Sequence, residues 1–462
     1  MTHVKVVRGR HWHVAVMHQY LPDLATQTVP RYTSYPTAAE FHDGVGAIEQ
    51  HAAATALAPH TPVSLYVHIP YCHEICWYCG CNTGAIGRSD RLAAYLAALE
   101  QEIDAVAAAL RGRVTAIHFG GGSPNALSSA QFVALTARLR MRFDCAENLE
   151  IAAELDPRTL NATYAAALAL SGVTRVSLGV QTFAPAIQAR INRHQPLALV
   201  QRVVGELRAA GIARINFDLL YGLPGQDKAD VVETIAATLA LAPNRIALFG
   251  YAHMPRLLPR QRMIDNAELP DGPARFAQHM LGHDLLVSAG YEAIGFDHFA
   301  RPDDSLARAA AEGRLRRNFQ GFTDESAEAI IGLGASAISH YPGLLVQNEK
   351  HVGRYRLRAA NGGFSGARGV VRSADDRLRG AVIERLLCDG AVDLGDLAGR
   401  YGAPVMALME LLPSLARFVA RDLIAVTNTH VTVLPAGLPY ARLIAAAFDR
   451  YRTPAPRFSR AI

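Results

Sequence analysis

Short apolar segments alternate with longer amphipathic segments through the middle of the chain. Segments of almost continuously apolar sequence lie at residues 63–70, 114–122, 149–157, 175–181, 214–222 and 245–253. This pattern is typical of parallel strands that are covered on both faces. The segments between them have helical periodicity, as in residues 90–110, where the larger apolar side chains fall on one face. Six such strand–helix units predict an α/β fold with a partial (β/α)6, TIM-like barrel.

The sequence on either side of this alternating pattern is different. We expect three parts: an N-terminal arm at residues 1–55, a catalytic barrel at residues 56–364, and a smaller, mainly helical domain at residues 365–462. The first 16 residues, rich in His and Arg, are expected to be disordered. The last domain is predicted to hold two helices and a strand pair that turns near Asn428, a winged-helix-like arrangement. Its candidate recognition helix is apolar and contains Glu410, so DNA reading is not expected.

Composition and charge narrow the class of protein. The chain has 462 residues, of which 50% are hydrophobic and 19% charged, as in ordinary globular proteins. The 46 Lys and Arg exceed the 41 Asp and Glu by only five, and no run of five basic residues occurs, so nucleic-acid binding is not expected. Because the sequence has no apolar stretch of 18 residues and no signal-peptide pattern, we expect a cytoplasmic protein without a membrane span. We also expect a monomer.

Four of the six cysteines, Cys72, Cys76, Cys79 and Cys81, fall within ten residues. In a reducing compartment such a cluster indicates a metal centre rather than disulfides. A structural zinc site is one interpretation, but the sequence lacks the second ligand pair that zinc usually takes. Three thiolates on one loop can instead hold three irons of a [4Fe–4S] cluster and leave the fourth iron open. Cys81 could be a fourth ligand, but only Gly80 separates it from Cys79, so we assign the ligands as Cys72, Cys76 and Cys79.

The C-x3-C-x2-C spacing resembles the signature of radical S-adenosylmethionine (SAM) enzymes, and other motifs extend the resemblance to one family. These motifs are PRYTSYPTA (30–38), SLYVHIPYCHEICWYCGCN (64–82), HFGGGSPN (118–125), ELDPR (154–158), LGVQTF (178–183), DLLYGLPGQ (218–226) and RNFQGFT (317–323). Together they resemble the oxygen-independent coproporphyrinogen III oxidases. The resemblance implies conversion of two propionates of coproporphyrinogen III to vinyl groups, which gives protoporphyrinogen IX in haem biosynthesis. It also implies one [4Fe–4S] cluster, two SAM molecules per substrate, an electron donor and an unidentified electron acceptor.

A radical-SAM-like haem chaperone, which binds and transfers haem, is the alternative function. The CGCN tetrad at residues 79–82 and the RNFQGFT segment favour the oxidase, because the haem-handling relatives typically have an aromatic residue in the position of Cys81.

The resemblance implies roles for individual residues. Contacts to the SAM that binds the cluster are implied for Tyr66, Gly121, Glu154, Ala252 and Ile338. Contacts to a second SAM are implied for Tyr78, Gly122, Ser123, Gln181, Arg193 and Asp218. Arg31 and Gln320 are implied to lie near the substrate. No side chain is expected to be catalytic in itself, because the SAM-derived 5′-deoxyadenosyl radical does the chemistry.

A substrate with four carboxylates also needs cations, because guanidinium groups pair with carboxylates in a bidentate geometry. The candidates in the sequence are Arg31, Arg193, Arg316 and Arg317.

Overall fold

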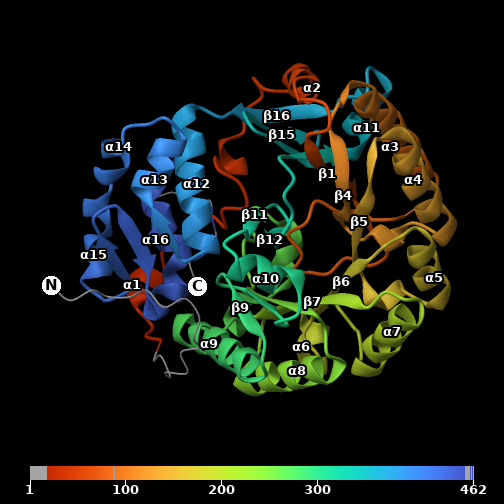
Figure 1. Cartoon of the computed structure of the whole chain (residues 1–462). Helices are drawn as coiled ribbons and strands as arrows, with labels where there is room; N and C mark the ends of the chain where they lie inside the picture. The colour runs from red at the N-terminus through yellow and green to blue at the C-terminus, as the bar shows by residue number, and fades with distance from the viewer. Residues whose placement is uncertain (1–17, 88, 453–457, 459, 461–462) are drawn as a thin grey trace.

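The computed structural model describes residues 18–87, 89–452, 458 and 460. A large sheet curves around the centre of the molecule, and a smaller part, drawn in blue, packs beside its open side (Figure 1). The sheet has twelve described strands in the order β16-β15-β14-β13-β1-β4-β5-β6-β7-β8-β10-β9. The expectation of disorder for the first 16 residues falls outside the described residues.

The six predicted strands form the parallel part of this sheet. They are β1 (Pro62–Ile69), β4 (Arg113–Gly121), β5 (Cys145–Leu155), β6 (Arg175–Gln181), β7 (Arg214–Tyr221) and β8 (Arg245–Gly250). The helices on the outer face are α3 (Ser89–Ala109), α4 (Ser129–Arg142), α5 (Ala162–Leu170), α6 (Pro185–Arg190), α7 (Leu197–Ala209), α8 (Lys228–Leu241) and α9 (Gly272–Ser288) (Figure 1). The predicted partial (β/α)6 barrel is confirmed, although β8 ends three residues earlier than its apolar segment.

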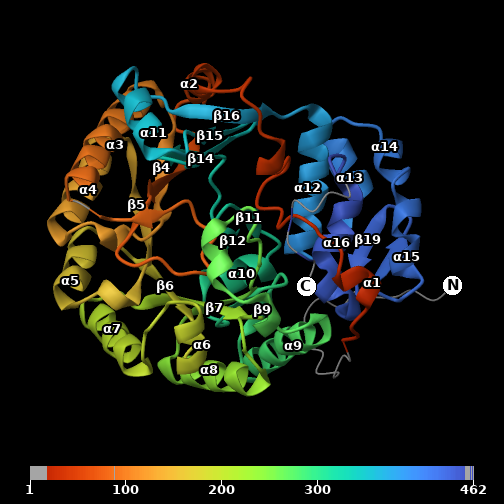
Figure 2. The same ribbon diagram turned by 180° about the vertical axis from the view of Figure 1, so that it is seen from behind.

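Additional strands extend both edges of the sheet. On one edge β13 (Ala329–Leu333) pairs in parallel with β1, and β14 (Ile338–Tyr341), β15 (Leu344–Asn348) and β16 (Gly366–Val371) follow in antiparallel order. On the other edge β10 (His298–Ala300) and β9 (Glu292–Ile294) are antiparallel. The outermost strands, β9 and β16, do not pair with each other in the described part of the chain, so the barrel is open on one side. The hairpin of β11 (Arg316–Asn318) and β12 (Gly321–Thr323) lies in this opening (Figures 1 and 2).

The main apolar core lies between the sheet and its outer helices. Phe119 of β4 and Phe132 of α4 are fully buried, with ring centroids 4.8 Å apart. Helix α4 begins after Ser128, whose hydroxyl accepts a hydrogen bond from the Gln131 backbone amide, and Gln131 Oε1 accepts one from the Ser128 amide. Helix caps of this kind and the apolar core hold the carboxyl ends of the strands in place. Active sites of (β/α) barrels lie at these carboxyl ends.

The C-terminal part has a separate core. Its helices are α12 (Ala374–Cys388), α13 (Leu394–Arg400), α14 (Met406–Met409), α15 (Ala416–Val419) and α16 (Ala441–Ala445). Its strands are β17 (Ala391–Asp393), β18 (Ile424–Thr427) and β19 (His430–Val433), in the order β17-β19-β18. The turn between β18 and β19 contains Asn428, as predicted, whereas β17 is not evident in the sequence.

The N-terminal arm joins the two cores. Leu24, at the end of α1 (Pro22–Ala25), is fully buried in the C-terminal core, and the Tyr32 hydroxyl donates a hydrogen bond to Asp449 Oδ2 (2.9 Å). The arm then crosses to the barrel, where His42 pairs with Gly369 of β16 before α2 (Ala47–Thr55) begins (Figures 1 and 2). Helices α10 (Ser305–Ala311) and α11 (Val352–Ala360) complete the fold. Within the described residues, every helix is too short or too polar to cross a bilayer.

Candidate active site

The cysteine loop follows β1 and is held between the short strands β2 (Tyr71–Cys72) and β3 (Gly84–Ala85). The sulfur of Cys72 lies 3.3 Å from the Thr83 hydroxyl. The sulfur of Cys79 accepts a hydrogen bond from the Cys81 backbone amide (3.4 Å). A hydrogen bond from the Cys81 thiol, which outweighs burial, lowers the pKa of Cys79 to about 6. The thiolate form, which is the metal ligand, is therefore favoured at Cys79.

The sulfur of Cys76 faces two arginines. Arg193 Nη1 lies 3.3 Å and Arg158 Nη2 3.4 Å from this atom, and both guanidinium groups also contact the Asp156 carboxylate. Arg193 is only 5% exposed. Burial opposes ionisation of Asp156, but the charges of Arg193 and Arg158 lower its pKa. This arrangement places positive charge beside a metal-ligand sulfur and keeps the arginines paired.

The donors around these sulfurs suit an iron–sulfur cluster. No three described His, Cys, Asp or Glu side chains gather around one point as a mononuclear metal site would require. A [4Fe–4S] cube does not need that arrangement, since each cysteine binds a different iron. N–H and O–H donors aimed at the sulfurs are the interactions that tune such clusters. Cys72, Cys76 and Cys79 therefore fit the cluster, and the role of Cys81 stays a prediction.

The glycine run at the end of β4 packs directly beneath the cysteine loop. Gly121 has φ +112°, and a Cβ there would come within 2.9 Å of the His68 ring. The Gly122 amide donates to the Ile69 carbonyl (2.7 Å), and a Cβ at Gly122 would meet the Tyr71 carbonyl oxygen at 2.5 Å. Only glycine fits both places, so the backbone of this loop can approach the cysteine loop and whatever it binds.

Ser123 lies at the end of the same run, but its hydroxyl is used within the protein. It is 4% exposed, donates to the side chain of Asn125 and accepts from the Asp156 amide (3.1 Å). Asn125 in turn donates to the Asp156 carbonyl and to Thr159 Oγ1, both at 2.8 Å. Ser123 and Asn125 thus join the loops after β4 and β5.

The barrel interior is polar. His118 Nε2 and Glu154 Oε1 are 2.9 Å apart, and the His118 ring stacks on Tyr66 with centroids 6.0 Å apart. Burial opposes the charge of both members of the pair, but their hydrogen bond lowers the pKa of Glu154 and raises that of His118. Asp218 accepts a hydrogen bond from Ser177 (3.2 Å). Burial, together with the charge of Glu154, raises the pKa of Asp218 to about 7.

Two adjoining cavities occupy this interior. One, of about 210 Å³, is lined by His118, Glu154 and Gln320. The other, of about 310 Å³, is lined by five of the residues that the resemblance implies: Arg31, Tyr78, Gln181, Asp218 and Ala252. Asp218 and Phe249 line both cavities. Gln181 has φ +67° at a register shift between β6 and β7, and such strain is typical of functional positions.

Several residues implied by the resemblance lie outside these two cavities. Arg193 faces Cys76, Ser123 is buried in its loop network, and Ile338 begins β14. The roles implied for all these residues, and for Tyr66, Gly121, Gly122 and Glu154, stay predictions.

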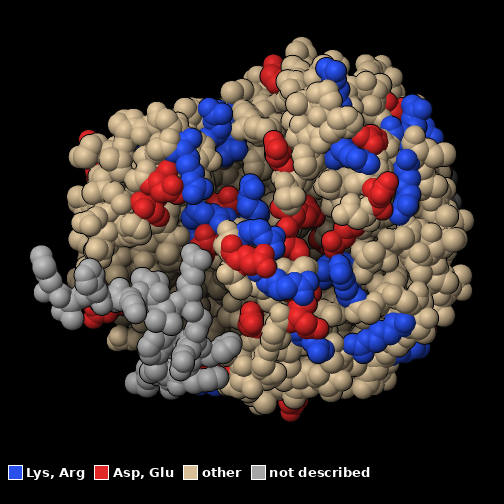
Figure 3. All heavy atoms as spheres, viewed as in Figure 1, with Lys and Arg blue, Asp and Glu red and all other residues tan. Residues whose placement is uncertain are grey.

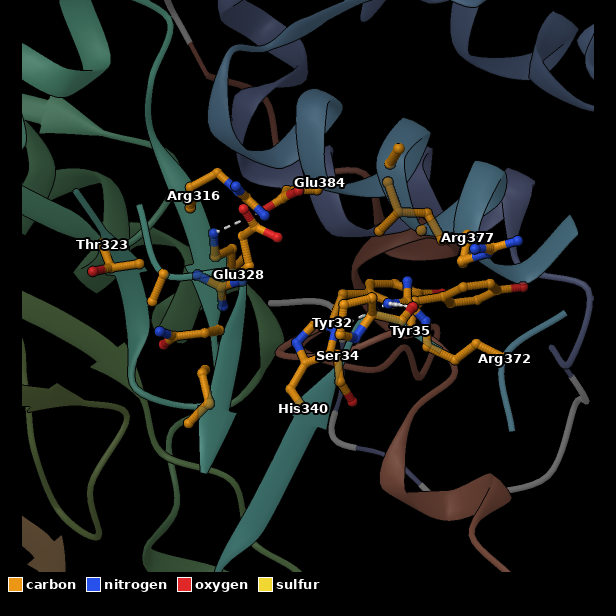
Figure 4. Close-up of a pocket in the computed structure, with 18 of the residues that line it drawn as sticks. Tyr32, Ser34, Tyr35, Arg316, Thr323, Glu328, His340, Arg372, Arg377 and Glu384 are labelled. Atoms are coloured by element: carbon orange, nitrogen blue, oxygen red, sulfur yellow. Dashed lines mark hydrogen bonds and ion pairs between the residues drawn. The ribbon is translucent and has the colours of Figure 1, made fainter. Parts of the chain in front are cut away.

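A fissure of about 390 Å³ separates the barrel from the C-terminal part. It is lined by the arm at Tyr32 and Tyr35, by the β11–β12 hairpin and by α12 (Figure 4). Arg316 faces Glu384 across it, with Nε 3.1 Å from Oε1 (Figure 4). Acidic and basic side chains gather around the hollow in this part of the surface (Figure 3). Because Arg316 pairs with Glu384, its charge is already neutralised.

Sequence reasoning missed several polar residues of the interior. His118, Ser177 and Asn216 line the smaller cavity, and Arg158 contacts Cys76. His118 and Gly120 alternate along β4, as Asn216 and Asp218 do along β7, so a period of two would have placed them on the inner face. Arg158 carries no comparable signal, because it lies outside the strands, in the short 3₁₀ helix Pro157–Thr159 after β5.

The half-open (β/α)6 barrel, with three cysteines spaced C-x3-C-x2-C directly after its first strand, defines a radical SAM protein. Residues 66–237 match the radical SAM superfamily, and residues 373–440 match the HemN C-terminal domain. The oxygen-independent coproporphyrinogen III oxidase of Bradyrhizobium diazoefficiens is 44% identical over 439 residues, which cover 94% of this chain and 98% of that protein. The enzyme of the same name from Escherichia coli is 36% identical over 442 residues, 95% of each chain.

The structural comparison agrees. The structure of coproporphyrinogen III oxidase (HemN) from Escherichia coli, described as a radical SAM enzyme, superposes with a TM-score of 0.88 at 35% identity. The match covers 92% of this chain and 100% of that chain. The chain belongs to the family of oxygen-independent coproporphyrinogen III oxidases. It is a radical SAM oxidoreductase whose cofactors are a [4Fe–4S] cluster and SAM, and the haem-chaperone alternative is not favoured.

Proposed function

We propose that this protein oxidises coproporphyrinogen III without oxygen and gives protoporphyrinogen IX in haem biosynthesis. The observation that carries the proposal is the cysteine loop over a polar interior cavity, in a chain that aligns with named oxidases over almost their full length. Each of the two reacting propionates, –CH2–CH2–COO⁻, becomes –CH=CH2 and CO2. One hydrogen atom leaves to a SAM-derived radical and one electron to an acceptor, so two SAM molecules are used per substrate.

Cys72, Cys76 and Cys79 would hold the cluster, and the residues around the 310 Å³ cavity would hold SAM. When bound, the reduced cluster and SAM supply a carbon-centred radical that can take a hydrogen atom. The residues of the chain position the substrate and exclude water. Gln320 on the β11–β12 hairpin and the Glu154–His118 pair line the adjoining 210 Å³ cavity, so they are placed to contact a substrate there.

The arm and the hairpin are placed to shield this chemistry. Arg31 Nη2 donates to the Gly250 carbonyl at the end of β8 (3.0 Å), and Arg317 of β11 donates back to the Arg31 carbonyl (3.1 Å). These contacts hold the arm across the open side of the barrel. A covered site prevents a reactive radical from being lost to solvent.

The proposal also covers the electron donor and acceptor, the oligomeric state and the cellular location of the protein. Reduction of the cluster requires an electron donor, and the decarboxylation requires a one-electron acceptor, neither of which the sequence identifies. We also propose that the protein acts as a monomer in the cytoplasm.

The proposal is tested by an anaerobic assay of the cluster-loaded protein with SAM, a strong reductant, coproporphyrinogen III and cell extract as a source of the acceptor. Formation of protoporphyrinogen IX with about two 5′-deoxyadenosines per molecule would support it. Deoxyadenosine without a vinyl product would retain the radical chemistry and exclude this substrate. If neither product forms on a fully loaded cluster, the haem-chaperone function becomes the better account.

A further inference from the structure

His298, the first residue of β10, carries an imidazole whose orientation is fixed by its neighbour in sequence. Its Nδ1 lies 2.6 Å from Oδ1 of Asp297, and both side chains are buried. Burial opposes ionisation of Asp297, but the His298 ring and the charge of Arg317 lower its pKa to about 2. Because a carboxylate only accepts hydrogen bonds, the ring hydrogen is held at Nδ1. In the neutral ring, Nε2 is then a hydrogen-bond acceptor.

Aromatic neighbours fix the plane of the same ring. His298 makes T-shaped contacts with Phe249, at the end of β8, and with Phe322 of β12, with ring centroids 5.5 and 5.2 Å apart. Gly321, which precedes Phe322, has φ +115°, and a Cβ there would come within 2.9 Å of Nε2. The glycine therefore leaves the Nε2 side of the imidazole uncovered.

The Nε2 edge of the ring faces the interior of the barrel. His298 lines the 210 Å³ cavity together with Gln320, whereas Asp297, which holds Nδ1, lines a separate hollow toward the C-terminal part. In the described part of the chain, Nδ1 bonds Asp297 and Nε2 has no hydrogen-bond partner. A buried acceptor of this kind is costly unless something pairs with it.

The carboxylates of the same cavity that the resemblance links to SAM are already engaged within the protein. Glu154 is paired with His118 (2.9 Å), and Asp218 accepts a hydrogen bond from Ser177 (3.2 Å). His298 differs from them because its one acceptor atom is held in a fixed direction and left without a partner. This combination indicates a site for a single N–H or O–H donor of a ligand.

The substrate of the proposed reaction has donors of this type. A porphyrinogen contains four pyrrole rings, and each of them carries one N–H group. Pockets for drug-sized ligands have volumes of about 300–1,000 Å³. The cavity at His298 is smaller, about 210 Å³, so it suits one pyrrole ring with its propionate rather than the whole tetrapyrrole.

The proposed reaction gives that N–H group a role in one step. A SAM-derived radical takes a hydrogen atom from the carbon next to the ring, so that ring–CH2–CH2–COO⁻ becomes ring–CH•–CH2–COO⁻. The substrate radical then loses one electron to the acceptor and releases CO2, which leaves ring–CH=CH2. As the electron leaves, positive charge spreads over the pyrrole ring and makes its N–H a stronger donor. An acceptor already aimed at this N–H stabilises the developing charge.

We propose that His298 Nε2 accepts a hydrogen bond from the N–H of the pyrrole ring whose propionate reacts. The inference rests on the proposed function and adds a substrate-binding residue to it. The resemblance to the family implied no role for His298, which lies in the barrel opposite the cysteine loop only through the pairing of β10 with β8.

The test compares two substitutions at His298. His298→Phe keeps an aromatic ring and removes Nε2, whereas the side-chain carbonyl of His298→Gln can accept the same hydrogen bond. The matched control is His283→Phe, because His283 lies on the outer helix α9 with its Nδ1 3.2 Å from the carboxylate of the next residue, Asp284. On cluster-loaded protein, kcat, the 5′-deoxyadenosine formed per vinyl group and the thermal midpoint are measured. Anaerobic ultrafiltration without SAM or reductant gives the Kd for coproporphyrinogen III.

We expect His298→Phe to raise this Kd about two- to tenfold, as the loss of one neutral hydrogen bond predicts. Its kcat should fall about tenfold or more, because the bond is stronger to the charged ring. A substrate radical that loses its electron slowly is instead reduced by the reductant and takes up a proton, so deoxyadenosine per vinyl group should rise above the wild-type ratio. His298→Gln should recover Kd and kcat to within about threefold, and His283→Phe should match the wild type.

Wild-type kcat and Kd in His298→Phe would overturn the inference. So would an unchanged ratio of deoxyadenosine to vinyl groups, whatever the Kd, since this is the result expected if His298 binds a propionate. Loss of the cluster or a lower thermal midpoint in both His298 variants would make the residue structural and would also overturn it. A wild-type protein that forms no vinyl product contradicts the proposed function itself, and that result appears before any variant is made.

Discussion

The Arg193 Nη1 atom lies 3.3 Å from the sulfur of Cys76, and a second guanidinium, that of Arg158, lies 3.4 Å from the same sulfur; both also contact Asp156. Two guanidinium groups donate to this one sulfur, while Asp156 contacts both of them and Glu74 pairs with Arg158 at 2.6 Å. Because reduction adds negative charge to an iron–sulfur cluster, cationic donors at a ligand sulfur favour the reduced state. The chain therefore uses side chains from the loops after β5 and β6 to influence the cysteine loop after β1.

Arg158→Met tests this effect, because it removes one charge and one hydrogen bond from the Cys76 sulfur while Arg193 remains. We expect a more negative midpoint potential for the cluster, with iron content unchanged. An EPR-monitored redox titration measures it. Arg138→Met, which removes an arginine from α4, should leave the potential at the wild-type value. Equal potentials in the wild type and Arg158→Met would show that the contact is structural only.

Cys81→Ala should retain a cluster of about four irons and four sulfides per chain, whereas Cys79→Ala should lose it. Cys81 donates to the Cys79 sulfur through its thiol and through its backbone amide (3.4 Å), and the substitution removes only the thiol. Alanine keeps that amide. Iron and sulfide analysis after anaerobic reconstitution decides the matter, and loss of the cluster in Cys81→Ala would make Cys81 a ligand.

Asp218→Asn should raise the stability of the protein above neutral pH. The folded pKa of Asp218 is about 7, raised from 3.8 by burial and by Glu154, and only partly offset by Ser177, Arg193 and His118. A carboxyl with a raised folded pKa contributes its full stability below the unfolded pKa and loses it as pH rises through the folded pKa. The wild type should therefore lose stability between about pH 4 and 7 relative to the variant.

We expect Asp218→Asn to be more stable by about 1–3 kcal/mol at pH 8, less than the full shift implies because the cavity is open to solvent. Denaturant unfolding of the cluster-loaded protein at pH 5 and pH 8 measures the difference. Asp227→Asn is a poor control because Asp227 caps α8, so the exposed Asp284→Asn serves instead. If the free energy of unfolding differed between Asp218→Asn and the wild type by the same amount at both pH values, titration of Asp218 would not be the cause.

The barrel could be predicted because local pattern and topology agree in it. Each apolar segment became a parallel strand, and the carboxyl ends of parallel strands meet at one edge, so Glu154, Gln181 and Asp218 could be placed near the cysteine loop from their positions alone. The cysteine spacing needs no tertiary information either. These features depend on neighbours in sequence or on strand order.

The hollow between the barrel and the C-terminal part could not be predicted in this way. Arg275 lies on α9 and Arg442 on α16, and they meet only because the C-terminal part packs against the open side of the barrel. Sequence periodicity gives the face of a helix but not its partner. For Ser123 the sequence position suggested a contact that the structure does not show. Its place in the glycine run indicates a ligand contact, whereas its hydroxyl donates a hydrogen bond to the side chain of Asn125.

Glu102 is a buried hydrogen-bond acceptor that connects several elements behind the cysteine loop. It is fully buried and accepts hydrogen bonds from the Gly334 amide (2.6 Å), the Tyr355 hydroxyl (2.8 Å) and the Asn348 side chain (2.9 Å). Next to it, the Tyr95 hydroxyl donates to the carbonyl of His68 on β1 (2.6 Å). These bonds connect α3 and α11 with the turn between β13 and β14.

Glu102→Ala should therefore destabilise the protein by about 3 kcal/mol, because three buried donors lose their acceptor. Glu100→Ala, on the same helix with a side chain 46% exposed, should change stability by no more than about 0.5 kcal/mol. Burial raises the pKa of Glu102 to about 7, so the wild type loses part of this contribution as pH rises from about 4.5 to 7. Denaturant unfolding should accordingly show a larger loss in Glu102→Ala at pH 5.5 than at pH 8.5. A loss matching that of Glu100→Ala would mean that the Gly334, Tyr355 and Asn348 donors find other acceptors, and that the turn does not depend on Glu102.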